Sequence, residues 1–232
     1  MRGYTERTKK LREISTTTQP SISLERAVLE TEFYEKYYGT VETPVLRALN
    51  FKNYMEKRKL YIGEGELIVG EKSEGPQVAP TFPELCCHTL EDMTVMNDRK
   101  YISFKVKEED KKVQEEKIIP YWEKRSMRHK ILESMTQEWK DCYAAGMFTE
   151  FMEQRAPGHT VADGKIYEKG FLDFKREIEE EIGKLDFLND PDACDKKAQL
   201  EGMAISCDAI IIYGKRYAQY ARELASKETD PK

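Results

Sequence analysis

A long helix predicted near the end of the sequence constrains the fold more than any other segment. Asp190 and Pro191 begin it, because proline is well tolerated in the first turn of a helix, and its pattern runs to about Ser226. Its apolar positions, which fall on more than one side, are Leu200, Met203, Ile205, Ile210, Ile212 and Tyr213. A helix that is apolar nearly all round is normally buried. We therefore expect other elements to pack around this helix.

Helical patterns also dominate the rest of the chain. One helix is predicted over 23–38, where Gly39 ends it, and another from Thr43, with Pro44 at its first position. Further helical segments are predicted at 88–97, 108–117, 121–135, 136–143 and 167–185. The sequence thus predicts a mainly α-helical fold with a few short strands.

Two segments do not follow a helical pattern. Glycines at 63, 65 and 70 bracket Glu66–Val69, whose apolar and β-branched residues predict a short strand. The segment 74–83 contains one glycine and three prolines, which remove hydrogen-bond donors and fix φ. This second segment is predicted to be a loop.

The composition is unusually polar for 232 residues. Charged residues make up 35% of the chain, against about 25% in typical domains. Apolar residues make up 39%, and the figure is the same when glycine is counted in place of tyrosine. Typical domains have roughly 45–50% by the count that includes glycine. This balance suits long exposed helices or a piece of a larger protein whose other part supplies more of the core.

Charge and patterning argue against several classes of partner. A formal net charge of −5 gives no basic background for a nucleic-acid partner. The longest apolar run, 209–213, is far shorter than a membrane span. Five cysteines form an odd set without pattern, which favours a reducing compartment over a disulfide framework. We expect a cytoplasmic protein with no nucleic-acid or membrane partner.

Two groups of residues invite chemical interpretations that their spacing opposes. The glycines of 63–70 could approach a phosphate, but two glutamates lie among them and no Gly-Lys-Ser/Thr follows. Cys86, Cys87 and His88 are ligand types, yet adjacent cysteines do not readily face one tetrahedral ion. A cysteine nucleophile paired with His88 or His159 stays open, since it needs only spatial adjacency. We predict that the glycines of 63–70 form turns, that the thiols of Cys86 and Cys87 are buried and structural, and that the chain has no metal site.

The segment 148–160 gathers aromatic, acidic, amide, basic and imidazole side chains around a Pro-Gly turn. One interpretation is a helix end, with Arg155 and His159 interacting favourably with the helix dipole. The other places Phe151 against an apolar substrate ring, with His159 as a hydrogen-bond donor or proton carrier. The pattern alone leaves both open.

Segments along nearly the whole chain, from about residue 5 to 226, resemble glycyl radical enzymes of the pyruvate formate-lyase type. The most specific is 150–160, which is similar to the Arg-x-Pro-Gly-His-Thr region near the front of these enzymes. Other similar segments, in chain order, are 7–12, 25–27, 66–71, 83–89 and 169–173. Residues 148–151 and 154–159, together with 84–88, most resemble the branch of the family that dehydrates hydroxyproline.

The resemblance implies a fold and a set of pocket residues. Residues 1–232 would be the N-terminal portion of a pyruvate formate-lyase-type domain, forming the outer helical layer and a first edge of a ten-stranded α/β barrel. Phe151 would pack on a pyrrolidine ring and His159 would lie at the substrate. Arg155, Glu153 and Phe148 are expected to support this pocket.

The family's catalytic Cys loop and Gly-radical domain have no match in this chain. The resemblance therefore places the glycyl radical outside it, and we expect no catalytic residue and no bound cofactor within it. The implied partners are the missing C-terminal portion of the enzyme, a radical-SAM activating enzyme, a small-molecule substrate and, in the complete enzyme, a second copy in a homodimer. The isolated chain is expected to be inactive.

Three alternatives to a hydroxyproline dehydratase stay open. The substrate could be glycerol, propanediol, choline or another small polar molecule, because pocket residues outside this chain contribute to the choice. The chain could instead be a non-catalytic scaffold descended from the radical enzyme. As a third alternative, it could be a helical domain whose Pro-Gly turn only resembles the family.

Overall fold

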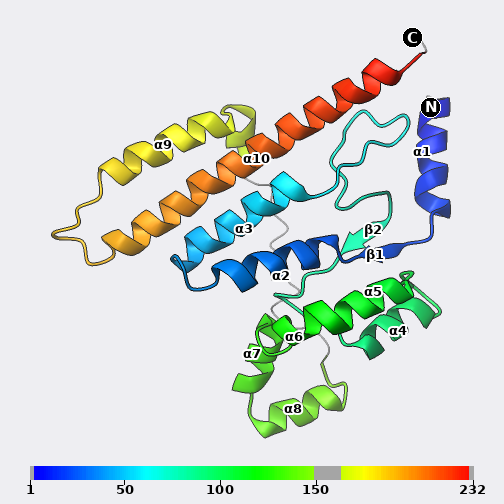
Figure 1. Cartoon of the computed structure of the whole chain (residues 1–232), viewed down its shortest axis with the longest axis horizontal. Helices are drawn as coiled ribbons and strands as arrows, with labels where there is room; N and C mark the ends of the chain where they lie inside the picture. Colours follow the sequence, from blue (N-terminus) through cyan, green and yellow to red (C-terminus); the bar gives the residue numbers. More distant parts are fainter. Residues whose placement is uncertain (1–2, 149–162, 230–232) are drawn as a thin grey trace. The chain divides into compact units, whose positions relative to one another are not determined.

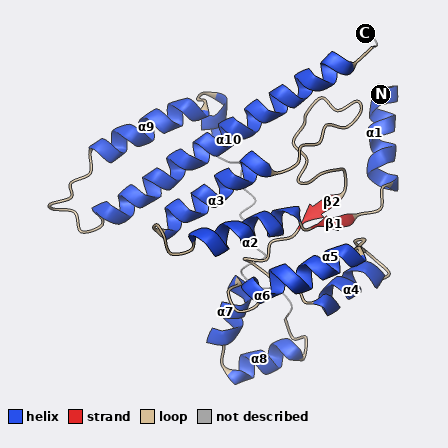
Figure 2. Cartoon of the chain, viewed as in Figure 1, coloured by secondary structure: helices blue, strands red, loops and turns tan. Residues whose placement is uncertain are grey.

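The computed structural model describes residues 3–148 and 163–229, which are mostly helical with two short strands (Figure 2). The predicted mainly α-helical class is confirmed. The chain forms two compact units. The first unit comprises residues 1–31 and 75–159, and the second comprises residues 32–74 and 160–232. Helix α2 (Glu25–Tyr37) contributes residues to both.

The two strands lie in the first unit and pair in parallel. They are β1 (Ser21–Ser23) and β2 (Val78–Pro80). The amide of Ser21 donates to the Gln77 carbonyl at 3.1 Å, and that of Thr81 donates to the last carbonyl of β1 at 3.2 Å. The prediction of a loop over 74–83 was therefore wrong at β2. Pro80 lacks an N–H, but the pairing uses the carbonyl before β2 and the amide after it, so the missing donor is not needed.

Six further helices belong to the described part of the first unit. They are α1 (Glu6–Thr17), α4 (Leu90–Asp98), α5 (Glu108–Val113), α6 (Ile119–Trp122), α7 (Met127–Ser134) and α8 (Gln137–Ala144). A π-helical turn, Gln114–Ile118, joins α5 to α6. The predicted helix over 121–135 is interrupted, because the Ser126 side chain accepts a hydrogen bond from the amide of His129 and begins α7 there. Ile22, Leu24, Met93 and Val106 form the buried apolar cluster of this unit.

The second unit is built around α10 (Ala193–Lys227), which packs along α3 (Thr43–Lys57) and α9 (Phe171–Gly183) (Figure 1). A short 3₁₀ turn, Asp163–Tyr167, precedes α9. Helix α3 begins as predicted, with proline in its first turn. None of the helices in the described residues is both long and apolar enough to cross a bilayer.

Apart from Tyr217, helix α10 buries small residues and leaves larger apolar ones half-exposed. Its buried positions include Ala193, Ala198, Gly202, Cys207 and Ala209. Leu200, Ile205, Ile210, Ile212 and Tyr213 are only half-buried, and Met203 is 52% exposed. The described residues therefore bury one side of α10, whereas the sequence predicted burial on nearly all sides.

The strand predicted at Glu66–Val69 is absent, which corrects the sequence analysis. These residues form turns and bends, and Leu67 and Ile68 are 77% and 92% exposed. A strand requires a neighbour that accepts and donates its backbone hydrogen bonds. In the described part of the chain, the sheet consists of β1 and β2 and offers this segment no partner.

The approach of α10 to α3 generates a stability prediction. A Cβ placed on Gly202 would lie 3.0 Å from the Pro44 carbonyl oxygen, whereas a Cβ on Gly214 of the same helix would meet nothing within 4 Å. We expect Gly202→Leu to lower the free energy of unfolding by about 1–3 kcal/mol through overpacking. The matched Gly214→Leu change should raise it by about 0.5–1 kcal/mol, since glycine is a poor helix former. Urea denaturation followed by circular dichroism measures both, and equal effects would contradict the close approach.

Candidate functional site

Five residues were predicted to form or support a substrate pocket, and the structure describes one of them. Phe148 is half-buried in the first unit. Phe151, Glu153, Arg155 and His159 lie outside the described residues, so their predicted roles stay predictions. The structure does show how the chain is held at Phe148, immediately before that segment.

Phe148 lies against two aromatic rings of α8. Its ring centroid is 5.4 Å from that of Trp139 and 5.7 Å from that of Tyr143. The chain turns after α8 at Gly146, whose φ of 72° is a left-handed conformation that glycine adopts readily. The Met147 amide donates to the Cys142 carbonyl at 3.0 Å across this turn. The turn and the ring contacts together hold Phe148 against α8.

Tyr143 is in turn held by Arg128 of α7. Nη2 of Arg128 donates to the Tyr143 hydroxyl at 2.6 Å, and Nη1 donates to Sγ of Cys86 at 3.4 Å. The backbone amide of Arg128 donates to the Leu85 carbonyl at 3.0 Å. A single arginine therefore connects α7, α8 and the loop that carries the adjacent cysteines.

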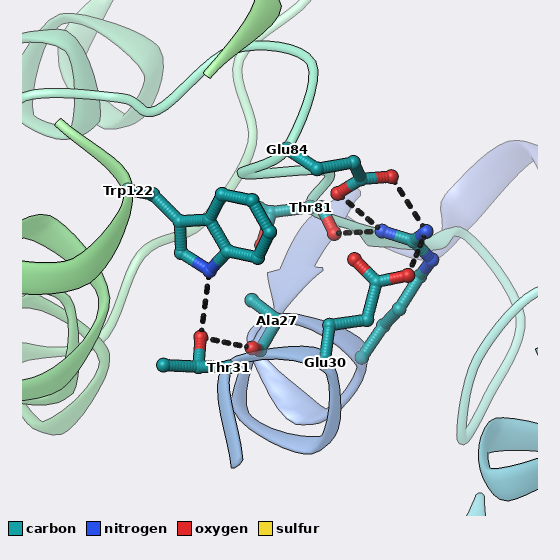
Figure 3. Close-up of polar contacts among 7 residues, drawn as sticks. Ala27, Glu30, Thr31, Thr81, Glu84 and Trp122 are labelled. Carbon is teal, nitrogen blue, oxygen red and sulfur yellow. Dashed lines mark hydrogen bonds and ion pairs between the residues drawn. The ribbon is translucent and has the colours of Figure 1, made fainter. Parts of the chain in front are cut away.

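This loop is fixed on its other side by Arg26 of α2 (Figure 3). The guanidinium of Arg26 donates to both carboxylate oxygens of Glu84, at 2.7 and 3.0 Å, and also binds Glu30. It lies 4.0 Å above the ring of Phe82 and donates to the Thr81 carbonyl at 3.3 Å. Bidentate pairing with a carboxylate restricts the geometry as well as adding energy.

The charge of this cluster depends on hydrogen bonding. Burial alone would raise the pKa of Glu84, but the hydrogen bonds with Arg26 and Glu30 and the charge of Arg26 together outweigh burial and hold the pKa below its ordinary value of 4.5. Glu84 is therefore ionised at neutral pH. The side chains of Arg26 and Glu30 are 13% and 5% exposed, so solvent screens this ion pair weakly.

A second contact ties α2 to α6 beside this cluster (Figure 3). The indole Nε1 of Trp122 donates to the hydroxyl of Thr31 at 2.9 Å, and that hydroxyl donates to the Ala27 carbonyl at 2.7 Å. Thr31 is fully buried and Trp122 nearly so. Buried polar groups normally require such partners. Both contacts lie within the first unit.

Cys87 and His88 are not arranged as a reactive pair. Burial, with smaller effects from neighbouring acidic groups, raises the pKa of the Cys87 thiol to about 12. Burial also lowers the pKa of His88 and outweighs the opposing effect of Asp92. At neutral pH these residues are a thiol and a neutral imidazole, so neither carries the charge of an activated thiolate–imidazolium pair. Among the described residues, no group of three His, Cys, Asp or Glu side chains is placed to hold a metal ion.

A hollow in the described residues of the second unit lies among α3, α9 and α10 and has a volume of about 1250 Å³. It is open to solvent and mostly apolar, with Phe51, Phe171, Phe174, Leu200 and Met203 among its lining residues.

Sequence reasoning did not identify the roles of Arg128, Tyr143 and Arg26. Arg26 and Glu84 are separated by 58 residues, and Arg128 and Cys86 by 42. Helical spacing reveals partners three or four positions apart, but it carries no information about partners this distant. The similarity of 25–27 and 83–89 to one family was the available signal, and it did not show that these two segments meet.

Comparison with known proteins gives one family match. Residues 4–232 match the family described as Pyruvate formate lyase-like. Over 229 residues the chain is 62% identical to trans-4-hydroxy-L-proline dehydratase of Clostridioides difficile, and the match covers 99% of this chain and 29% of that protein. The chain therefore spans less than a third of that relative's length.

Solved structures agree with this match. A crystal structure of hydroxyproline dehydratase from Clostridioides difficile, with trans-4-hydroxy-L-proline bound, is similar with a TM-score of 0.92 and 62% identity, over 99% of this chain and 29% of the other. The glycerol-bound B12-independent glycerol dehydratase from Clostridium butyricum is similar with a TM-score of 0.89 and 28% identity, over the same shares of the two chains.

The raised pKa of Cys87 generates a prediction about thiol reactivity. At about pH 8, a thiol with a pKa near 12 is ionised in about one molecule in 10⁴, and the thiolate is the reactive form. We expect iodoacetamide to alkylate Cys87 at least about 100-fold more slowly than exposed Cys194. Peptide mass spectrometry against time measures both rates.

The control is the same reaction in urea, where the two rates should converge as burial is lost. Equal rates in the native protein would contradict a structural role for Cys87 and would favour an activated cysteine.

Proposed function

The chain belongs to the Pyruvate formate lyase-like family, and we propose that it is the N-terminal portion of a glycyl radical lyase that dehydrates trans-4-hydroxy-L-proline. The observation that carries this proposal is the 62% identity to the Clostridioides difficile dehydratase over 229 residues. Identity to the glycerol dehydratase from Clostridium butyricum is 28%, so glycerol and related small alcohols are supported less strongly as substrates.

In this proposal the chain supplies binding and orientation. Phe151 packs on the pyrrolidine ring, His159 forms a hydrogen bond with the hydroxyl that leaves or protonates it, and Arg155 and Glu153 hold the turn between them. A glycyl radical held outside this chain supplies the radical chemistry that starts the reaction. The described contacts of Phe148 with Trp139 and Tyr143 support the part that concerns this chain, because they hold the residue from which the segment continues.

The proposal includes partners that this chain alone does not contain. They are the C-terminal portion of the enzyme, a radical-SAM activating enzyme and a second copy of the complete enzyme. We propose a cytoplasmic, anaerobic setting for the assembled enzyme. The isolated chain is expected to show no radical signal and no dehydratase activity.

A hybrid enzyme tests the proposed function directly. Residues 4–232 would replace the matching part of the Clostridioides difficile dehydratase, and the product would be activated without oxygen. We expect turnover of trans-4-hydroxy-L-proline within about tenfold of the parent, because 62% identity preserves most contacts at the junction. A hybrid that carries the glycyl radical by electron paramagnetic resonance but turns over glycerol or choline instead would contradict the proposed substrate. One that turns over none of these would favour a scaffold.

Two substitutions in the hybrid enzyme separate the proposed roles of the pocket residues. Phe151→Ala removes apolar contact with bound substrate and should raise KM by about 5- to 150-fold, equivalent to about 1–3 kcal/mol. His159→Gln removes an interaction that strengthens in the transition state and should lower kcat by on the order of 10² or more. Steady-state kinetics on trans-4-hydroxy-L-proline measures both.

Matched controls use the same substitutions at positions outside the segment 148–160. Phe187→Ala, at a half-exposed ring, and His129→Gln, on α7, should leave both constants near those of the unsubstituted hybrid. A normal kcat in His159→Gln would return His159 to the role of a helix-end histidine that interacts with backbone carbonyls.

A further inference from the structure

We propose that Arg128 is a positioning residue for Phe148, which is predicted to support the substrate pocket, and this inference rests on the proposed function. Arg128 is placed to act on the point where the chain leaves α8. Its guanidinium joins the Tyr143 hydroxyl at 2.6 Å to Sγ of Cys86 at 3.4 Å. It acts through Tyr143 and Phe148, so it affects substrate binding without touching the substrate.

The anchor for this arrangement is the loop of residues 84–87. The amides of Met127 and Arg128 donate to the carbonyls of Glu84 and Leu85, at 2.8 and 3.0 Å. These donors belong to the start of α7, where the first backbone amides of a helix have no partner within the helix. Both the backbone and the side chain of Arg128 therefore bind one loop, which fixes the direction of the guanidinium.

The element that Arg128 positions is α8. Helix α8 has eight residues and no buried side chain, so apolar packing alone fixes it weakly. The hydrogen bond from Arg128 reaches α8 at Tyr143, one residue before its end. Because the Tyr143 ring also contacts Phe148, fixing the hydroxyl limits the movement of both rings.

The chemistry of arginine suits this task. A guanidinium offers two Nη groups in a planar fork, so it can donate to two partners on different segments at once. Lysine has one nitrogen on a flexible stem and reaches two such partners less well. Burial opposes the charge of Arg128, but its hydrogen bonds with Cys86 and Tyr143 favour the charged form and raise the pKa of its guanidinium. The positioning charge is therefore maintained at all physiological pH values.

The test compares Arg128→Ala with Arg125→Ala in the hybrid enzyme. Arg125 is nearby and donates to the Tyr121 carbonyl at 2.7 Å, but no described contact links it to α8 or to the loop of residues 84–87. We expect Arg128→Ala to raise KM for trans-4-hydroxy-L-proline at least about fivefold with kcat within about twofold, and Arg128→Lys to recover part of the loss. Arg125→Ala should change neither constant.

A second measurement uses the 232-residue chain itself. Hydrogen exchange of a peptide covering 137–148 should be at least about threefold faster in Arg128→Ala than in Arg125→Ala, because the end of α8 opens more often. Tyr143→Phe, which keeps the ring and removes the hydroxyl, should show the same acceleration.

The outcomes separate the inference from the proposed function. Turnover by the unsubstituted hybrid is measured first, and its absence contradicts the proposed function before any variant is compared. With turnover present, an unchanged KM in Arg128→Ala overturns the positioning role. The same holds if this variant loses thermal stability and active enzyme but the remaining active enzyme has an unchanged KM. Unchanged hydrogen exchange in 137–148 overturns the mechanism by which Arg128 is proposed to act.

Discussion

The ion pair between Arg26 and Glu84 is the interaction on which most of the first unit depends. A guanidinium that is 13% exposed has lost most of its hydration, and this loss is offset only by close pairing. Arg26 pairs with Glu84 and Glu30, contacts the ring of Phe82 and donates to the Thr81 carbonyl. Removing one partner of a buried pair typically costs about 3–5 kcal/mol, because the other charge remains buried. The start of α2 and the loop after β2 are thus held as one piece.

The direction of the Glu84 pKa shift shows at which pH the ion pair with Arg26 stabilises the fold. A carboxyl whose pKa is lowered on folding contributes its full stabilisation above the unfolded pKa and loses it as the pH falls through the folded value. The ion pair is therefore complete at neutral pH. The loop that it holds presents the carbonyls of Glu84 and Leu85 to α7, and α7 carries Arg128 toward Tyr143. The placement of Phe148 thus follows from a charge pair formed by residues far from it in sequence.

Local signals in the sequence predicted local structure well. Gly39 after α2 and Pro44 in the first turn of α3 were predicted correctly, because a helix boundary depends on the residues next to it. The long helix near Ala193–Lys227 was also predicted, since its periodicity is intrinsic to its own residues. The family resemblance indicated which residues would form or support a substrate pocket.

What the sequence did not predict depends on partners distant along the chain. The segment Glu66–Val69 has the composition of a strand but no neighbouring strand in the described residues, while β2 has a proline yet pairs with β1. Strand formation therefore followed the availability of a partner and not local propensity. For the same reason the roles of Arg26 and Arg128 became visible only in the structure. Phe151 and His159, which the sequence singled out, keep roles that rest on the resemblance.

Two contacts, one in each unit, differ in the kind of substitution that they tolerate. In the first unit, hydrogen-bonded charges and the Trp122–Thr31 contact connect the segments, so a change that preserves volume but removes a donor is costly. In the second unit, Gly202 lets α10 approach Pro44 of α3, so a change that adds volume is costly even when it is apolar. In the first unit, the hydrogen bond from Arg128 to Tyr143 extends this network to the ring that contacts Phe148, so the loss of a donor there also affects a predicted pocket residue.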